Sequence, residues 1–328
     1  MLIENVELTM SHLGLGNLTE YALMVLFGNA HSHHLTLGVE NTPDQILDHQ
    51  GHVLYPAYFM THLQVPPHVL LPSFRLWEHV QVGVDVKRFG ETLLESAYIL
   101  GRGDGLPEDA EQWDLENHPS VKANNLIVVD VTEGGAARKV SVPKPGCFAS
   151  LPKIKRPPQA ITRAKQVRSN GFDMPGFEAK ITTDRPISYF VEPHRDAAPG
   201  HAMIFAKFFE VMDHAETKLL SERLQPGFQN VALNGLNVLE RETYFYGNCF
   251  AGEFLDIFIR ADARVCDSDF HGDSLHMISA AVFEFQIEVY QHRNNQLLAM
   301  ARVKKLLALP TFAQDSLQDV KRLLTLHF

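Results

Sequence analysis

The fold is decided by the stretch GLGNLTEYALMVLF, residues 14–27, in which a polar, glycine-containing turn leads into an almost unbroken apolar run. Such a run leaves no polar face, so it predicts a helix that is buried on most sides. Asn17 followed three positions later by Glu20 resembles a capping box and predicts that the helix starts here. A second stretch, PGHAMIFAKFFEVM at residues 199–212, repeats the arrangement and predicts a second buried helix that starts near Ala202.

Strand-like segments follow each predicted helix. They span residues 52–65, 76–89, 91–100 and 124–132 after the first helix, and 229–246, 253–265, 276–290 and 296–308 after the second. Apolar and polar residues alternate along them, which is typical of antiparallel strands with one solvated face. A long helix followed by a meander, twice, predicts an α+β double hot-dog fold in which each helix lies inside a curved sheet.

The length of 328 residues is enough for two units, each with a core of its own. We expect a first hot-dog unit at residues 1–140, a linker at 141–185 and a second unit at 186–328. The linker is rich in proline, and no acidic residue occurs between Glu133 and Asp173, a stretch that carries nine Lys and Arg residues. Two interpretations stay open: a solvated connector, or a surface for the phosphates of coenzyme A or the acidic helix of an acyl carrier protein.

Composition argues against several other classes of protein. The net charge of -10 disfavours a nucleic-acid partner. No apolar run approaches the roughly 18 residues that a membrane span needs, and no export signal is recognisable, so we expect a cytoplasmic protein without a membrane partner. The three cysteines, Cys147, Cys249 and Cys266, are scattered, which predicts reduced thiols rather than disulfides or a zinc site.

Common catalytic motifs are missing from the sequence. It contains no phosphate-binding P-loop, no Gly-x-Ser-x-Gly elbow and no His-Glu-x-x-His helix, and residues 14–19 lack the third glycine of a dinucleotide fingerprint. His31, His33 and His34 cluster at the end of the first predicted helix, where exposed histidines are favourable without any metal. We therefore expect no metal and no nucleotide cofactor.

Thioester chemistry needs a stabiliser for the charge that develops on the acyl oxygen. Backbone amides at a helix N-terminus supply one, and the turns before the two predicted helices are candidates. Tyr55 and Tyr58 lie on the strand expected after the first helix. A free phenol, with a pKa of about 10, is a weak nucleophile, and a tyrosine in a strand is more often a packing residue.

Three segments resemble a known family: MSHLGLGNLTE at 10–20, GNAH at 28–31 and LYPAY at 54–58. Together they are similar to the bifunctional acyltransferase/decarboxylase family of polyketide biosynthesis, whose type member belongs to the leinamycin pathway, and the resemblance spans most of the chain. It implies a double hot-dog fold. It also implies that methylmalonyl-CoA, or another malonyl-type thioester, is decarboxylated and that the acyl group passes to an acyl carrier protein.

The resemblance also implies roles for particular residues. Tyr55 would accept the acyl group, with Tyr58 as its competitor because Pro56 makes a bulge plausible. Amides near Gly16 and Asn17 would hold the thioester carbonyl, and His31 would assist proton transfer. Further substrate contacts are expected from Leu18, Thr19, Tyr58, Lys153, Lys155 and Arg156.

Two alternatives stay open. A hot-dog thioesterase or dehydratase would use His12, Glu20 or Asp213 as its base and would release a free acid or an enoyl thioester. A non-catalytic acyl-binding protein would have no polar group facing either helix start. In each case we expect one productive site, mainly in the first half and closed over by the second, in a monomer or a homodimer.

Overall fold

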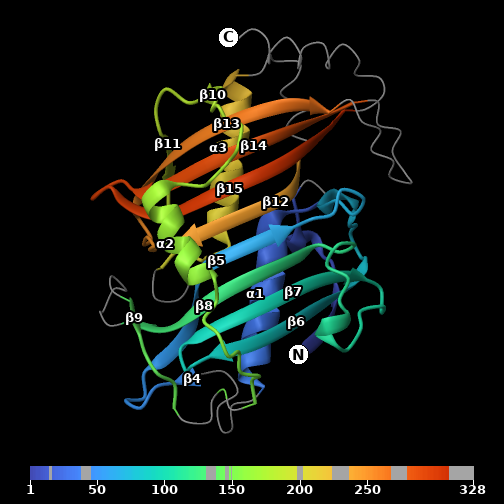
Figure 1. The fold of residues 1–328 in the computed structure, drawn as a ribbon, viewed down its shortest axis with the longest axis vertical. Helices are drawn as coiled ribbons and strands as arrows, with labels where there is room; N and C mark the ends of the chain where they lie inside the picture. Colours follow the sequence, from blue (N-terminus) through green and yellow to red (C-terminus); the bar gives the residue numbers. More distant parts are fainter. Residues whose placement is uncertain are drawn as a thin grey trace.

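A computed structural model describes residues 1–14, 17–37, 46–130, 138–144, 148, 150–197, 202–223, 236–266 and 279–309. These residues form a large, antiparallel, 13-stranded sheet (Figure 1). Its strands are β1 (Leu2–Glu7), β4 (Ile46–Leu47), β5 (Val53–Gln64), β6 (His79–Phe89), β7 (Leu93–Arg102), β8 (Ser120–Asp130), β9 (Arg138–Val140), β10 (Ile181–Thr182), β11 (Ile187–Phe190), β12 (Leu236–Phe245), β13 (Phe254–Cys266), β14 (Ser279–Gln291) and β15 (Gln296–Leu309).

Three α-helices accompany this sheet in the described residues: α1 (Glu20–Thr36), α2 (Ala160–Asn170) and α3 (Lys207–Arg223). A hairpin of β2 (Leu13–Gly14) and β3 (Asn17–Leu18) precedes α1, and short 3-10 turns occur at η1 (Met10–His12), η2 (Leu71–Ser73) and η3 (Ala110–Gln112). No helix in the described part of the chain is both long enough and apolar enough to cross a membrane.

The sheet repeats one strand order in its two halves. Its path runs β1-β6-β7-β8-β5-β12-β15-β14-β13-β10, with β11 also pairing with β13. In each half, the first long strand after the helix lies at the centre, followed outward by the fourth, third and second long strands and then by a strand that precedes the helix. The halves meet where β5 pairs with β12, from Met60↔Tyr244 to Gln64↔Glu240, and we call this pairing the seam. The predicted antiparallel strands are confirmed within the described residues, where the eight long strands lie at their expected positions. Residues 131–132, 229–235 and 276–278 of the expected segments lie outside the described residues.

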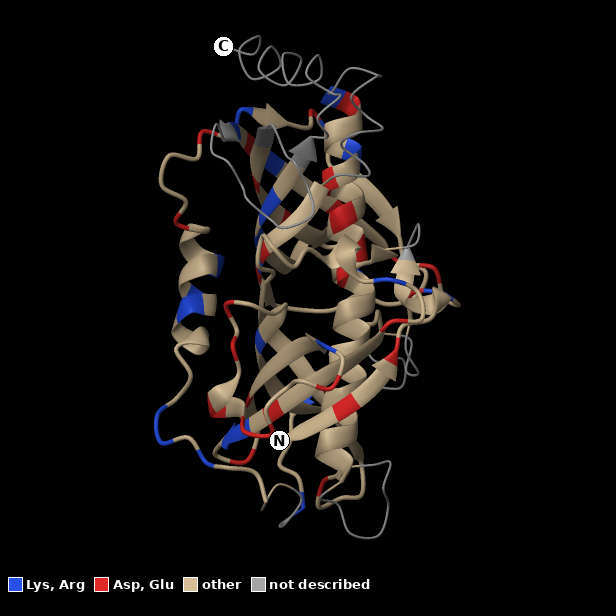
Figure 2. Ribbon diagram, turned by 90° about the vertical axis from the view of Figure 1, so that its right-hand side faces the viewer, with Lys and Arg blue, Asp and Glu red and all other residues tan. Residues whose placement is uncertain are grey.

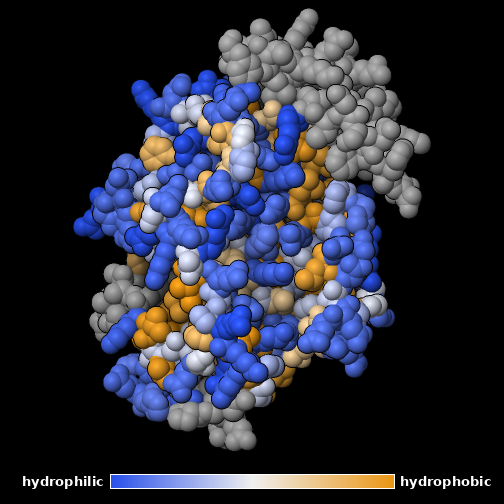
Figure 3. Space-filling view, in the orientation of Figure 1, coloured by the Kyte–Doolittle hydropathy of each residue, from blue (hydrophilic) through white to orange (hydrophobic). Residues whose placement is uncertain are grey.

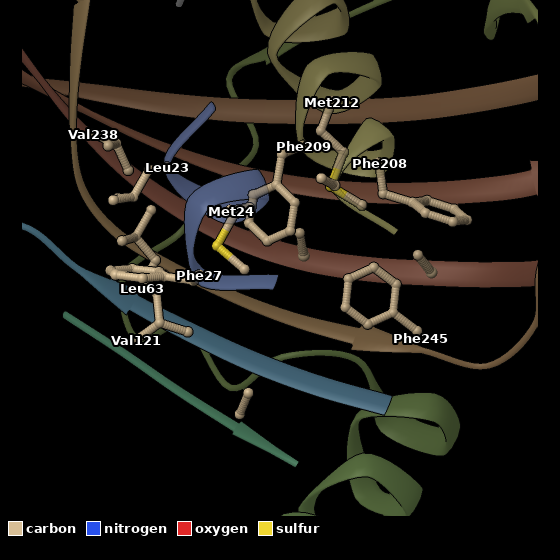
Figure 4. Packing of buried hydrophobic residues seen from close by; sticks show 14 of the residues in the cluster. Leu23, Met24, Phe27, Leu63, Val121, Phe208, Phe209, Met212, Val238 and Phe245 are labelled. Carbon is tan, nitrogen blue, oxygen red and sulfur yellow. The ribbon is translucent and has the colours of Figure 1, made fainter. Parts of the chain in front are cut away.

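α1 and α3 lie on one face of the sheet, and α2 lies on the other, which we call the outer face (Figures 1 and 2). Apolar residues on all sides of α1 are buried, so the predicted buried helix is confirmed. Figure 4 shows Leu23, Met24 and Phe27 of α1 near Phe208, Phe209 and Met212 of α3, with side chains of β5, β8 and β12 around them. Burying each such side chain contributes roughly 1.5–3 kcal/mol, so the inner face supplies most of the apolar stabilisation.

Both helices start later than predicted. Thr19 caps α1, because its hydroxyl accepts a hydrogen bond from the amide of Ala22 at 3.1 Å, whereas Asn17 lies in the β2–β3 hairpin opposite Gly14. The predicted capping box at Asn17 is therefore wrong. α3 begins at Lys207 instead of Ala202, because Ala202 is held extended by a β-bridge to Phe250.

The predicted linker contains a helix that the sequence analysis did not foresee. α2 packs on the outer face across the seam, where Val167 and Phe172 contact Tyr244 and Met300. Two consecutive prolines, at 157 and 158, stand before Gln159, the residue that precedes the helix, and proline close to a helix start is a signal for one. This signal was available in the sequence, so an entirely extended connector was the wrong expectation.

A buried ion network ties the halves together beneath the seam. Arg241 of β12 is fully buried and donates from Nε to Glu20 at 2.5 Å and from Nη2 to Glu216 at 2.8 Å. Lys305 of β15 lies 3.0 Å from Glu20, 2.6 Å from Glu216 and 2.5 Å from Asp213. Burial alone would raise the pKa of Glu20, but the two cations lower it to about 2, while burial keeps the pKa of Glu216 raised. The network therefore joins α1, α3, β12 and β15.

Replacing Arg241 by Met should lower the free energy of unfolding by about 3–5 kcal/mol, because two buried carboxylates would lose one of their two cationic partners and keep only Lys305. Urea denaturation followed by circular dichroism measures this loss. The control is Arg302→Met, which removes a partly exposed pair with Glu240 and should cost about 1 kcal/mol or less. Equal losses in both variants would show that the buried network does not stabilise the fold specifically.

Candidate active site

The seam is shorter than the strands that form it, and a cavity opens where it ends. Backbone pairing between β5 and β12 stops at Met60, while β5 continues beside β8 back to Tyr55. A cavity of about 610 Å³ lies here. Apolar residues that line it are Ala57, Phe59, Leu126, Val128, Val140, Phe245 and Phe250, and polar ones include Tyr58, Tyr246, Asn248, Glu253, Gln291 and Arg293. On the outer face, apolar side chains gather at the surface beside α2, over the ends of β8 and β9 (Figure 3).

Tyr58 begins a polar chain that runs from this cavity into the core. Its hydroxyl oxygen lies 3.1 Å from that of Tyr98 on β7, which lies 2.8 Å from Nδ1 of His31 on α1. The hydroxyl of Ser96 lies 3.4 Å from the same nitrogen. His31 and Tyr98 are buried among apolar side chains, so His31 is not the exposed helix-end histidine that the sequence predicted.

The second half of the chain closes this site. Phe205, in the segment that enters α3, stacks on Tyr58 with ring centroids 4.1 Å apart. A side chain at Gly28 of α1 would place its Cβ only 3.0 Å from the Phe205 ring. Gly28 therefore provides the space in which the ring lies between α1 and Tyr58. The polar chain thus meets the start of the second helix rather than the first, where it was expected.

Burial keeps the three hydrogen-bonded side chains, His31, Tyr98 and Tyr58, uncharged at neutral pH. It lowers the pKa of His31 to about 3, with a smaller contribution from the nearby His34. It raises the pKa of Tyr58 to about 12 and that of Tyr98 well above its ordinary value. Within the described part of the chain, Nε2 of His31 is buried without a hydrogen-bond partner. With the proton on Nδ1, this nitrogen is an acceptor, so the ring is neutral and its one donor faces Tyr98.

Tyr55 and Tyr58 point to opposite faces of β5. Both pair regularly with β8, opposite Val128 and Asn125, and residues three apart in a regular strand alternate sides. The bulge falls after Tyr58, between Tyr58 and Met60, and not at Pro56 as expected. The structure therefore brings His31 together with Tyr58, the predicted competitor, and places Tyr55 on the outer face.

The other predicted residues at the first helix lie elsewhere. Asn17, Leu18 and Thr19 line a second cavity of about 490 Å³ together with His12, Glu20 and Asp213. This cavity also contains Lys305 and adjoins the buried ion network. Asn17 is thus separated from His31 and Tyr58, and Gly16 lies outside the described residues.

Lys153, Lys155 and Arg156 are exposed and run beside β6. The amide of Ile154 donates to the carbonyl of Arg88 at 2.9 Å, and the amide of Arg88 donates to the carbonyl of Pro152 at 2.8 Å. Two strands, β7 and β8, lie between β6 and β5. The lining of the cavity beside Tyr58 does not include these three cations.

Comparison with known proteins places the fold but no family. No family model matches the sequence, and no curated protein matches it. An acyl-ACP thioesterase from Bacteroides thetaiotaomicron superimposes with a TM-score of 0.56 and 12% identity, over 92% of this chain and 96% of that chain. A protein from Lactobacillus plantarum assigned as an oleoyl thioesterase superimposes with a TM-score of 0.56 and 14% identity. The match covers 94% of this chain and 95% of that chain. The chain therefore has the hot-dog-like fold of these proteins, and the likeness at this identity concerns the fold alone.

The buried His31 should make the fold sensitive to acid. Its pKa is about 3 in the folded protein against 6.5 for an ordinary histidine. As the pH falls below 6.5, His31 takes up a proton in the unfolded chain but stays neutral in the folded protein. The free energy of unfolding therefore decreases as the pH falls from 6.5 to about 3. His31→Asn should flatten this loss in urea denaturation from about pH 7 to pH 4, and the exposed His68→Asn should not. Parallel pH profiles for the two variants would contradict the assignment.

Proposed function

We propose that the protein is an enzyme acting on acyl thioesters, that its reaction centre is the cavity beside Tyr58, and that its reaction is thioester hydrolysis. The observation that carries the proposal is a series of hydrogen-bonded, neutral side chains. It runs from His31 through Tyr98 to Tyr58, and Tyr58 lines a cavity. The fold shared with acyl-ACP thioesterases supports it. We interpret the two repeated halves as a double hot-dog, in which the seam replaces a subunit interface.

Tyr58 acts as a hydrogen-bond donor to the acyl oxygen. A phenol whose pKa is raised to about 12 stays protonated at neutral pH. With the His31 proton on Nδ1, His31 donates to Tyr98 and Tyr98 donates to Tyr58, which leaves the Tyr58 proton free for a substrate. A donor fixed in this way stabilises the oxyanion that forms when water attacks the thioester carbonyl.

Glu253 is the candidate general base. It lines the same cavity, and its two carboxylate oxygens accept hydrogen bonds from the amide of Phe250 at 2.8 Å and from Nε2 of Gln291 at 2.7 Å. These bonds fix its position while leaving lone pairs for a water molecule. Glu253 takes a proton from the attacking water, the carbon–sulfur bond breaks, and the proton passes to the thiolate, giving an acid and a thiol.

Decarboxylative acyl transfer, which the sequence resemblance implies, is the second candidate. Loss of carbon dioxide from a methylmalonyl thioester leaves an enolate, and a chain of neutral donors with no carboxylate among them suits its oxygen as well. Burial makes Tyr58 a poorer nucleophile than a free phenol, so it suits a donor rather than an acyl acceptor. Tyr55 as the acyl acceptor stays a prediction of that route.

Tyr58→Phe should lower kcat by about 10²–10³, the usual cost of removing one oxyanion donor, with little change in KM. The substrates are short and long acyl-CoA thioesters, methylmalonyl-CoA and their carrier-bound forms. A thiol reagent measures the thiol released, and intact mass spectrometry measures the carrier. Tyr55→Phe is the matched control on the opposite face and should retain hydrolysis. If Tyr55→Phe alone abolishes an acyl load on the carrier, the transfer reaction is correct. If no thioester is turned over, the protein is a binding protein.

Glu253→Gln separates the two reactions. Hydrolysis needs the carboxylate as a base, so we expect release of thiol and acid to fall by about 10²–10⁴, whereas decarboxylation needs no base. Release of carbon dioxide from methylmalonyl-CoA by this variant, together with lost hydrolysis, would favour the transfer route. Unchanged hydrolysis would remove Glu253 from the mechanism.

A further inference from the structure

One residue of the cavity wall contacts α2. Tyr246 lines the cavity, and its hydroxyl donates to the carbonyl of Ala164 in α2 at 3.0 Å. The guanidinium of Arg168 stands 5.3 Å from the centre of the Tyr246 ring. Val167, fully buried against the outer face, anchors the same helix turn. The exposed Arg168 therefore lies next to Tyr246, a residue of the cavity wall.

A second cation belongs to the same cavity. Arg293, in the exposed turn between β14 and β15, lines the cavity directly. Among the described residues, no carboxylate lies within ion-pair distance of Arg168 or Arg293, whereas Arg163 of α2 lies 3.6 Å from Glu242. The cavity also contains the carboxylate of Glu253, which already accepts two hydrogen bonds. Two arginine charges at the cavity are thus available to an anion.

The thioester reaction proposed above supplies a matching anion. Coenzyme A and acyl carrier proteins both present the acyl group on a pantetheine arm that ends in a phosphate. A cavity of about 610 Å³ is of the usual size for a small ligand. In a chain with a net charge of -10, a phosphate needs local cations to approach, and guanidinium groups bind phosphate strongly.

We propose that Arg168 and Arg293 bind the phosphate of a pantetheine arm, and that the arm then passes between β5 and the segment after β12 to Tyr58. This inference rests on the proposed function for its substrate class. The anion site expected from the sequence was at Lys153, Lys155 and Arg156, beside β6. The proposed site lies instead at α2 and the β14–β15 turn. Lysines and arginines also mark the segment that carries α2 in Figure 2.

The test compares three forms of one acyl group: a coenzyme A thioester, a carrier-bound thioester, and an N-acetylcysteamine thioester that lacks the phosphate. Arg168→Gln and Arg293→Gln should each raise KM for the two phosphate-bearing substrates about tenfold, with kcat retained and the N-acetylcysteamine thioester unaffected. Lys155→Gln is the matched control and should change none of them. An increase in KM with the carrier alone would identify a protein-docking surface instead, and equal effects on all three substrates would overturn the proposal.

Calorimetry separates this inference from the proposed reaction. The unmodified protein should bind 4′-phosphopantetheine about tenfold more tightly than pantetheine, and the difference should vanish in Arg168→Gln with Arg293→Gln. If 4′-phosphopantetheine binds more tightly than pantetheine but no thioester is hydrolysed, the phosphate site is supported and the proposed hydrolysis is wrong. If thioesters are hydrolysed but the two ligands bind equally, the phosphate site is wrong and the proposed hydrolysis is supported.

Discussion

The antiparallel pairing of β5 with β12 is the constraint on which the rest of the structure depends. It joins two repeated half-sheets into one, and it extends only from Met60 to Gln64 on β5. Because the seam is so short, β5 and β12 part beside Tyr58, where the first cavity opens and Phe205, in the segment entering α3, stacks on the tyrosine. At the other end β5 stops at Gln64, and one more backbone hydrogen bond joins the amide of Val65 to the carbonyl of Leu239. The second cavity lies near that end, lined by residues before α1 and by the first residues of β12.

The two ends of the seam differ in their chemistry. At one end, Glu20, Arg241, Glu216 and Lys305 are buried ions, and buried ions are stable only when they satisfy one another. These charged groups pair with one another, so we interpret the network as structural. At the other end the buried groups are neutral, and the hydrogen-bonded series ends at Tyr58, a residue that lines a cavity. This asymmetry agrees with a single productive site, and its polar chain comes entirely from the first half of the sequence.

Local sequence patterns predicted the features that depend on neighbouring residues alone. Alternation located the long strands, and the apolar run at 21–27 identified a buried helix. The helix start was missed because Asn17 pairs with Gly14 in the β2–β3 hairpin, so the local cap falls on Thr19 instead. Glu20, which the expected capping box would use, is held by Arg241, 221 residues away in the sequence. The choice between Tyr55 and Tyr58 was equally hidden. It depends on whether a bulge comes before or after Tyr58, and the packing of Met60 beneath α2 is a tertiary contact that no local pattern reports.

Burial of the phenol at Tyr58 has two consequences that act together. It makes the phenolate costly, which disfavours Tyr58 as a nucleophile, and in the proposed hydrolysis it would strengthen the hydrogen bond from Tyr58 to the oxyanion by excluding water. That burial depends on Phe205, which reaches Tyr58 only because Gly28 leaves room for it. Phe205 belongs to the second half of the chain, and Gly28 and Tyr58 belong to the first. The environment of the phenol therefore forms only when the seam joins the halves, so contacts that stabilise the seam also set the chemistry of the site.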